Sequence, residues 1–112
     1  MVKQGDIIML NFDPQSGREQ AGFRPAVVIS NDIFNIKTKM AIVCPITNSN
    51  RGFPLHIALD TRTKTTGYML CEHIKSLDLS VRNCKVVECV PDDLLDVVLA
   101  TVFSEMDKPK KI

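Results

Sequence analysis

At 112 residues the chain has the length of one domain rather than two. Its apolar content of 45% excludes a disordered protein, because such chains are poor in apolar residues. The 14 Lys and Arg side chains nearly balance 13 Asp and Glu, so a polyanion can bind only through a local patch. The longest apolar runs, such as Ile7–Leu10, are far shorter than the about 20 residues of a membrane span. With no leader pattern either, we expect a cytoplasmic protein without membrane contact.

Short β-strands are predicted over the first 90 residues. In Asp6–Phe12 the alternation puts Ile8, Leu10 and Phe12 on one face of a strand. The run Pro25–Ser30 is β-branched and typical of a buried strand, and its proline stands at the start, where a strand tolerates it. Ser30 or Asn31 can cap a single helical turn that ends at Asn35.

The second half of the chain continues this pattern and then changes. Further strands are predicted at Met40–Ile46, Leu55–Leu59, Gly67–Cys71, Ile74–Leu77 and Lys85–Val90. From Pro91 to Ser104, Leu95, Leu99 and Val102 recur at helical spacing behind two aspartates that suit a helix start. The fold class is therefore mainly β (α+β): a small, bent β barrel with a C-terminal α-helix.

Two polar loops are expected to converge at one end of a hairpin. The loops run from Asp13 to Gly22 and from Thr47 to Gly52. If Ser30 pairs with Ala41 in an antiparallel hairpin, Arg24 lies opposite Thr47 on the same face. A slip of one residue would put these two side chains on opposite faces.

The side chains gathered there are those that bind phosphate. Arg24 is a permanent cation whose planar fork matches a phosphate group. The two loops add positive charge, a carboxylate, amides and hydroxyls from Arg18, Glu19, Gln20, Thr47, Asn48, Ser49 and Arg51. A loop arginine beside a loop glutamate is also the pattern of an ordinary solvated surface pair. The residues by themselves therefore support an anion site and no more.

The cysteines and histidines do not predict a metal site or any other cofactor. Cys71-x-His73 and Cys84-x4-Cys89 fit no common closed zinc spacing. Cys44 lies on a predicted core strand. His56 alternates with apolar neighbours and is expected to face solvent or a dimer partner, and His73 is expected to have a structural role at a strand edge.

Three motifs in the right order resemble those of MazF/PemK-type toxins. The second motif is Pro45–Asn48 with Gly52–Pro54, and the third is Gly67–Asp78. The first motif consists of Gly5–Ile7, Asn11–Pro14 and Gly17–Ser30. The resemblance extends to about Asp107, which implies one toxin domain over residues 1–107 and a basic tail over residues 108–112.

This resemblance implies a PemK/CcdB-type barrel, related to SH3-like barrels, that works as a homodimer. It implies a toxin of a type II toxin-antitoxin system, an endoribonuclease that cuts single-stranded RNA at short sequences without a metal ion. Attack by the substrate's 2′-hydroxyl would leave 2′,3′-cyclic phosphate and 5′-hydroxyl ends. A small acidic antitoxin that covers the site is the implied protein partner.

By motif match, Arg24 and Thr47 are the central catalytic residues and Glu19 is the loop acid. Arg24 suits charge stabilisation better than proton removal, because its pKa is above about 12. Glu19 either accepts the 2′-hydroxyl proton or only positions Arg24. Some family members carry histidine at Phe23, so this chain lacks an imidazole there, and Phe23 either stacks on a base or plugs the loop.

The RNA itself would be held by polar side chains of the two loops and of one strand. Hydrogen bonds to splayed bases and contacts to flanking phosphates are expected from Arg18, Gln20, Asn48, Ser49, Asn50, Arg51 and Lys75. Two alternatives stay open: a CcdB-like toxin that poisons gyrase by contact, and a homologue that binds RNA without cutting it. The chain has no tryptophan and ends in Lys-Lys-Ile, which disfavours the gyrase alternative.

Overall fold

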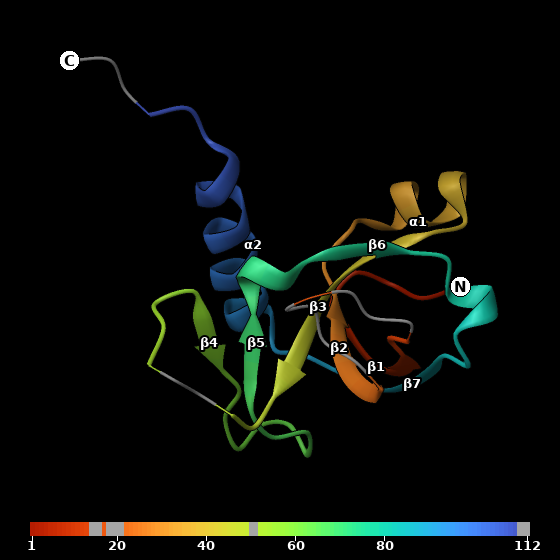
Figure 1. The fold of residues 1–112 in the computed structure, drawn as a ribbon, viewed down its shortest axis with the longest axis horizontal. Helices are drawn as coiled ribbons and strands as arrows, with labels where there is room; N and C mark the ends of the chain where they lie inside the picture. Colours follow the sequence, from red (N-terminus) through yellow and green to blue (C-terminus); the bar gives the residue numbers. More distant parts are fainter. Residues whose placement is uncertain (14–16, 18–21, 50–51, 110–112) are drawn as a thin grey trace.

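Seven short antiparallel strands form a strongly bent sheet in the computed structural model, which describes residues 1–13, 17, 22–49 and 52–109 (Figure 1). Two α-helices and two 3-10 turns, η1 (Cys71–His73) and η2 (Leu79–Val81), complete these ranges. The strands are β1 (Asp6–Asn11), β2 (Phe23–Val28), β3 (Ala41–Thr47), β4 (His56–Ala58), β5 (Tyr68–Leu70), β6 (Lys75–Leu77) and β7 (Lys85–Cys89). The helices are α1 (Asp32–Thr38) and α2 (Asp92–Met106).

Strand β3 organises the sheet because it pairs along both of its edges. Neighbouring strands follow the order β4-β5-β3-β2-β1-β7, and β6 pairs with β3 off this path. The first half of β3 pairs with β6 and its last two residues pair with β5. The pairing within the described residues traces an open path. The predicted mainly β fold with a C-terminal helix is thus confirmed, with a bent open sheet in place of a closed barrel.

Alternation along the strands divides the buried side chains between two clusters. Ile8, Leu10 and Phe12 belong to one cluster with Ala26 and Val28, as the sequence predicted. Neighbouring positions such as Ile7, Val27 and Cys44 belong to the other cluster, which Val98 and Val102 of α2 complete. Both sides of the sheet are therefore apolar near β1, β2 and β3, which makes this region a rigid support for the strand ends.

Helix α1 is longer than the single turn predicted through Asn35, since it continues to Thr38. Its predicted cap is confirmed at Asn31, whose Oδ1 accepts a hydrogen bond from the Phe34 backbone N–H at 2.8 Å. The helix ends where Lys39 adopts a left-handed conformation with φ of 58°. Asn35 is fully buried in this helix, its side chain is hydrogen-bonded to Ser30, and its carbonyl accepts from the Lys39 N–H at the end of the extra turn.

Replacing Asn35 with alanine is expected to lower the free energy of unfolding by about 1–3 kcal/mol, because it leaves buried polar groups unpaired. The Ser30 hydroxyl donates to Asn35 Oδ1, and Asn35 Nδ2 donates to the Ser30 carbonyl at 3.2 Å. Urea unfolding measures the loss. Lys37→Ala, an exposed change on the same helix, is the control and should be near neutral.

Helix α2 begins after Pro91 and ends at Met106, two residues beyond the predicted end at Ser104. Asp92 and Asp93 occupy its first turn, where their charge complements the helix dipole. It packs along the end of the sheet that carries β4 and η1 (Figure 1). Within the described ranges, neither helix has the length and apolarity to cross a membrane.

Candidate functional site

The pairing of β2 with β3 has the register that the sequence predicted. Ala26 lies opposite Pro45, and Val27 opposite Cys44. The paired residues run from Ala26–Pro45 to Val28–Val43, and this register continued by two residues would set Arg24 opposite Thr47, whose own backbone pairs with Tyr68 of β5. On its other edge Arg24 pairs with Leu10 of β1. Both Arg24 and Thr47 are half-buried at the ends of their strands.

Arg24 and Thr47 also belong to the same face of the sheet. Arg24 lies two residues before Ala26, and Thr47 lies four residues after Val43. Ala26 and Val43 both belong to the buried cluster that contains Phe12. Because side chains two and four residues apart share a face, Arg24 and Thr47 extend that apolar face as its polar end.

The Thr47 hydroxyl is oriented by the chain that follows it. The Ser49 backbone N–H donates a hydrogen bond to Thr47 Oγ1 at 3.2 Å. This bond uses an oxygen lone pair and leaves the hydroxyl hydrogen to be donated elsewhere. Thr47 can therefore donate to an oxygen of an anion placed at this strand end.

The turn before β5 packs directly against this strand end. Gly67 has φ of +121°, and a Cβ built there would lie 2.5 Å from the Thr47 carbonyl oxygen. The neighbouring Thr66 Oγ1 donates to Asn48 Oδ1 at 3.0 Å. Thr66 and Gly67 thus touch the site, and sequence reasoning assigned neither of them to it. The Thr-Gly pair just before an apolar run was the available signal.

The first polar loop is closed at its base. Phe12 N–H donates to the Gly22 carbonyl, and Gly22 N–H donates to Asp13 Oδ1, each at 2.9 Å. Arg82 was not predicted here, yet its Nη1 donates to the carbonyls of Asn11 and Asp13. Five predicted site residues lie outside the described residues: Arg18, Glu19, Gln20, Asn50 and Arg51.

Two further predicted site residues, Phe23 and Lys75, lie at different distances from Arg24 and Thr47. Phe23 immediately precedes Arg24 and is 53% exposed. Its ring is accessible for stacking. Lys75 lies opposite Val43 on β6, which is roughly 13 Å along β3 from Thr47 at the usual rise per residue. Lys75 therefore belongs to the same sheet face but not to its polar end.

The expectation that His56 faces solvent or a partner is wrong. Its side chain is only 9% exposed, and Nε2 lies 2.7 Å from Glu72 Oε2. The Phe53 ring packs edge-on against it. The His56–Glu72 pair joins β4, which follows the second polar loop, to η1. His56 therefore has a structural role in this part of the fold.

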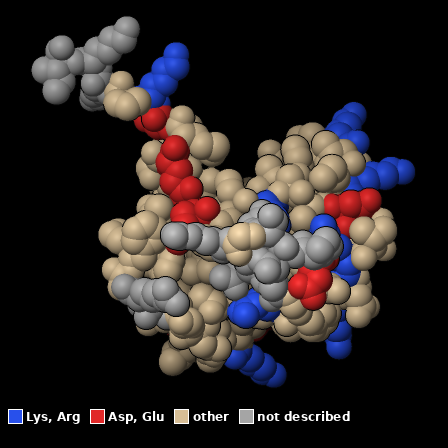
Figure 2. Space-filling view, viewed as in Figure 1, with Lys and Arg blue, Asp and Glu red and all other residues tan. Residues whose placement is uncertain are grey.

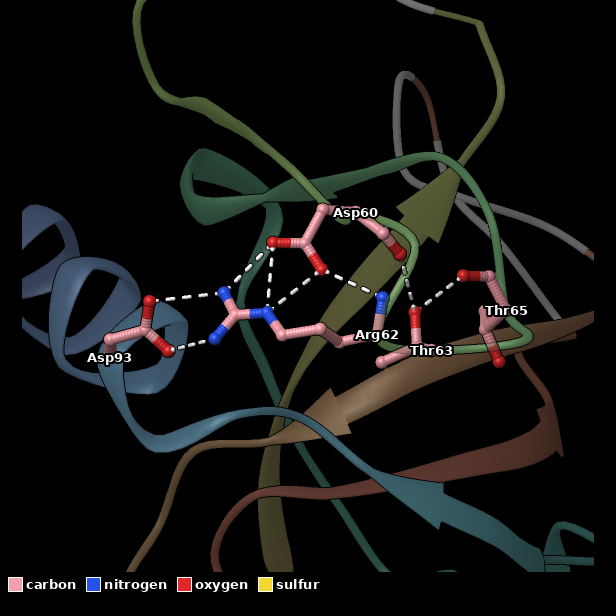
Figure 3. A network of polar contacts seen from close by, with 5 residues as sticks. All are labelled: Asp60, Arg62, Thr63, Thr65 and Asp93. Atoms are coloured by element: carbon pink, nitrogen blue, oxygen red, sulfur yellow. Dashed lines mark hydrogen bonds and ion pairs between the residues drawn. The ribbon is translucent and has the colours of Figure 1, made fainter.

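The turn from Asp60 to Thr66 is held to α2 by an arginine clamp. The Arg62 guanidinium lies between the carboxylates of Asp60 and Asp93, with contacts of 2.8 Å to each (Figure 3). Arg62 hydrogen bonds lower the pKa of both carboxyl groups. All three side chains are exposed, so these ion pairs add little to the stability of the fold. Their effect is to hold the turn against the start of α2.

A second carboxylate holds the same turn to β7. Glu88 accepts hydrogen bonds from the Thr65 N–H at 2.7 Å, the Thr65 hydroxyl at 2.6 Å and the Lys64 N–H at 3.0 Å. These donors, the Thr65 hydroxyl first among them, lower the pKa of the Glu88 carboxyl. The turn that touches Thr47 and Asn48 is therefore anchored from two elements.

Replacing Glu88 with glutamine is expected to reduce stability at neutral pH and to matter less in acid. A carboxyl whose pKa is lowered by folding stabilises the fold above its unfolded pKa of about 4.3, and this stabilisation is lost as the pH falls. Urea midpoints at neutral and acidic pH measure the difference. In Glu105 the pKa is raised by burial and by Glu72, so Glu105→Gln should show the opposite sign. A Glu88→Gln deficit that persists in acid would contradict the assignment.

Charge on the described surface is mixed. Figure 2 shows a row of acidic side chains toward the outer end of α2, and further acidic side chains among Lys and Arg on the opposite side of this face. Across the described residues, no group of three or more His, Cys, Asp or Glu side chains is positioned to hold a metal ion. The donor set at Arg24 and Thr47 is cationic and neutral, which suits an anion.

Known proteins match nearly the whole chain. The model of the family described as PemK-like, MazF-like toxin of type II toxin-antitoxin system matches residues 3–104. The endoribonuclease toxin MazF of Escherichia coli K12 is 35% identical over 98 residues, which are 88% of this chain and 87% of that protein. MazF from Deinococcus radiodurans superimposes with a TM-score of 0.89 at 33% identity, covering 94% of this chain and 96% of that one. A MazE-MazF structure from the same organism superimposes at 0.82 with 33% identity, over 94% and 95% of the two chains.

Proposed function

This chain belongs to the PemK-like, MazF-like toxin family of type II toxin-antitoxin systems and is an endoribonuclease, and we propose that it cuts single-stranded RNA through the substrate's own 2′-hydroxyl group. The observation that supports this proposal is the β2–β3 register, which, continued two residues beyond Ala26 and Pro45, would set Arg24 opposite Thr47 on one sheet face. An arginine fork and an oriented hydroxyl are the groups that hold a phosphodiester during in-line attack.

The reaction exchanges one phosphorus–oxygen bond for another. The 2′-oxygen bonds to phosphorus and its proton goes to the Glu19 carboxylate, while the bond to the 5′-oxygen breaks and that oxygen takes a proton from solvent. Arg24 stabilises the charge that develops on the phosphoryl oxygens, and the Thr47 hydroxyl donates to one of them. The products carry 2′,3′-cyclic phosphate and 5′-hydroxyl ends. No step uses a metal ion.

Base recognition falls to the side chains around this centre. The exposed Phe23 ring supports stacking on a base next to Arg24. Asn48 and Ser49 follow Thr47 directly and offer hydrogen bonds to base edges. Gln20, Asn50, Arg18 and Arg51 supply the remaining loop contacts in this proposal, and Lys75 holds a phosphate further along the same face.

Two protein partners complete the proposal. The first is a second copy of the chain, supported by exposed apolar side chains on α2 such as Val97, Phe103 and Met106. The second is an antitoxin with an acidic, partly disordered segment that covers Arg24, supported by the MazE-MazF structures to which the chain is similar. A homodimer that acts on messenger RNA and is silenced by such a partner would work in the cytoplasm.

The test is to incubate the purified protein with a long RNA of mixed sequence in EDTA and to map every new 5′ end. Discrete cuts with 5′-hydroxyl ends that Arg24→Ala lacks are the expected result. Cuts that need added metal would overturn the mechanism. Binding without cuts would identify a homologue that does not cleave, and cuts that persist in Arg24→Ala would relocate the site.

A further inference from the structure

We propose that Thr66 is a positioning residue that orients the side-chain amide of Asn48 and thereby determines which base edge this enzyme reads. The inference rests on the proposed function, because it assigns Asn48 to RNA recognition. Thr66 lies outside the three motifs and enters the site only through the turn between β4 and β5. The structural basis is a hydrogen bond from Thr66 Oγ1 to Asn48 Oδ1 at 3.0 Å.

This bond distinguishes the two ends of the amide. A threonine hydroxyl has one hydrogen, and here it is donated to the amide oxygen. With Oδ1 engaged toward the turn, Nδ2 points the opposite way and presents N–H donors. Asn48 is exposed and directly follows Thr47 in the chain, so these donors are accessible to a base bound beside this strand end. An oriented Asn48 therefore selects a base that offers an acceptor.

The Thr66 hydroxyl is itself held in place from outside the site. One residue earlier, Thr65 donates to Glu88 through both its N–H and its hydroxyl. One residue later, the backbone of Gly67 lies against Thr47, with room for no side chain. Leu59 N–H donates to the Gly67 carbonyl at 2.9 Å and closes the hairpin below. A turn fixed on both sides of Thr66 can hold Asn48 without moving when RNA binds.

The consequence is chemical discrimination at one base position. The exocyclic group of guanine (O6) or uracil (O4) is a carbonyl acceptor, whereas that of adenine (N6) is an amino donor, and the acceptors of adenine are ring nitrogens such as N7. An amide that is free to turn over can present its oxygen to the amino group as well as its nitrogen to a carbonyl. Loss of the Thr66 hydroxyl should therefore widen the choice of base rather than stop cleavage.

The experiment compares Thr66→Val, Thr66→Ser and Asn48→Ala with the wild type on an RNA library randomised around one cut site. Thr66→Val keeps the shape and removes the hydroxyl, while Thr66→Ser keeps the hydroxyl. Thr61→Val, at an exposed threonine in the same turn, is the matched control. Relative cleavage rates for each base at each position are read by sequencing the products. Thermal unfolding midpoints show that all variants are folded.

Thr66→Val is expected to lower discrimination at a single position by about threefold to tenfold, the size of one hydrogen bond. Asn48→Ala should lower the discrimination between bases at the same position. The double variant Asn48→Ala/Thr66→Val, included in the same comparison, should discriminate as well as Asn48→Ala alone. Thr66→Ser and Thr61→Val should keep the wild-type preference. An unchanged preference in Thr66→Val, additive losses in the double variant, or a uniform slowing at all sequences would each overturn the proposal.

Failure of the proposed function gives a different result from failure of this inference. If the wild type binds the library without cutting it, the same preferences are read from the bound fraction. A relaxed preference in Thr66→Val then supports the positioning role although the nuclease proposal has failed. If the wild type neither cuts nor binds RNA, both proposals are overturned.

Discussion

Replacing Arg24 with alanine is expected to slow RNA cleavage by about 10²–10³-fold, the usual cost of losing one preorganised donor to a charged transition state. Arg24 is half-buried near the start of β2, where it pairs with Leu10 of β1. Single-turnover cleavage of a short RNA that contains one mapped site measures the loss. Arg24→Lys should restore only part of the rate, because an ammonium group keeps the charge but not the fork.

The comparison separates local chemistry from overall charge. Lys37→Ala also removes one positive charge, from the exposed last turn of α1, and should cleave at the wild-type rate. Thr47→Ala should slow cleavage by about tenfold, since it removes a neutral donor. Equal losses in Arg24→Ala and Lys37→Ala would mean that Arg24 contributes only electrostatic attraction.

Adding a single methyl group at Gly67 is expected to slow cleavage by about 10²-fold, because a displacement of about 1 Å at a reacting group has that effect. The Cβ of Gly67→Ala would lie 2.5 Å from the Thr47 carbonyl oxygen and 2.8 Å from its carbonyl carbon. Both atoms are backbone, so Thr47 itself must move. The φ of +121° adds strain of about 1–3 kcal/mol for any L side chain.

The effect on the site has to be distinguished from the effect on folding. Gly5→Ala is the matched control, since Gly5 has φ of +92° and its Cβ would meet only the Leu95 and Val90 side chains. It should lower the unfolding midpoint and leave the cleavage rate of the folded protein unchanged. A Gly67→Ala protein that cleaves at the wild-type rate would show that the close contact between Gly67 and Thr47 does not hold Thr47 in place.

Local pattern predicted that Arg24 and Thr47 lie near the ends of two neighbouring strands, and the motif resemblance gave them their proposed catalytic role. Arg24 and Thr47 lie near the ends of two predicted strands, whose register was predicted from an assumed Ser30–Ala41 pair that a slip of one residue would change. The structure has that register. The capping role of Asn31 followed in the same way from a side chain and the three residues after it. Such features depend on residues that are close in the sequence, so they can be predicted from the sequence.

Contacts between distant segments decided the rest. The sequence alone determined the mainly β fold with its C-terminal helix and the alternation of the strand faces, because periodicity encodes them, whereas the β2–β3 register needed an assumed pair. It misjudged His56, because the alternation of β4 says nothing of Glu72 arriving from η1 to bury it. Only the tertiary structure brought Thr66 to Asn48 and Glu88 to Thr65, across 18 and 23 residues. The physical reason is that these hydrogen bonds join segments that only the bending of the sheet brings close together. No local conformational preference specifies that bend.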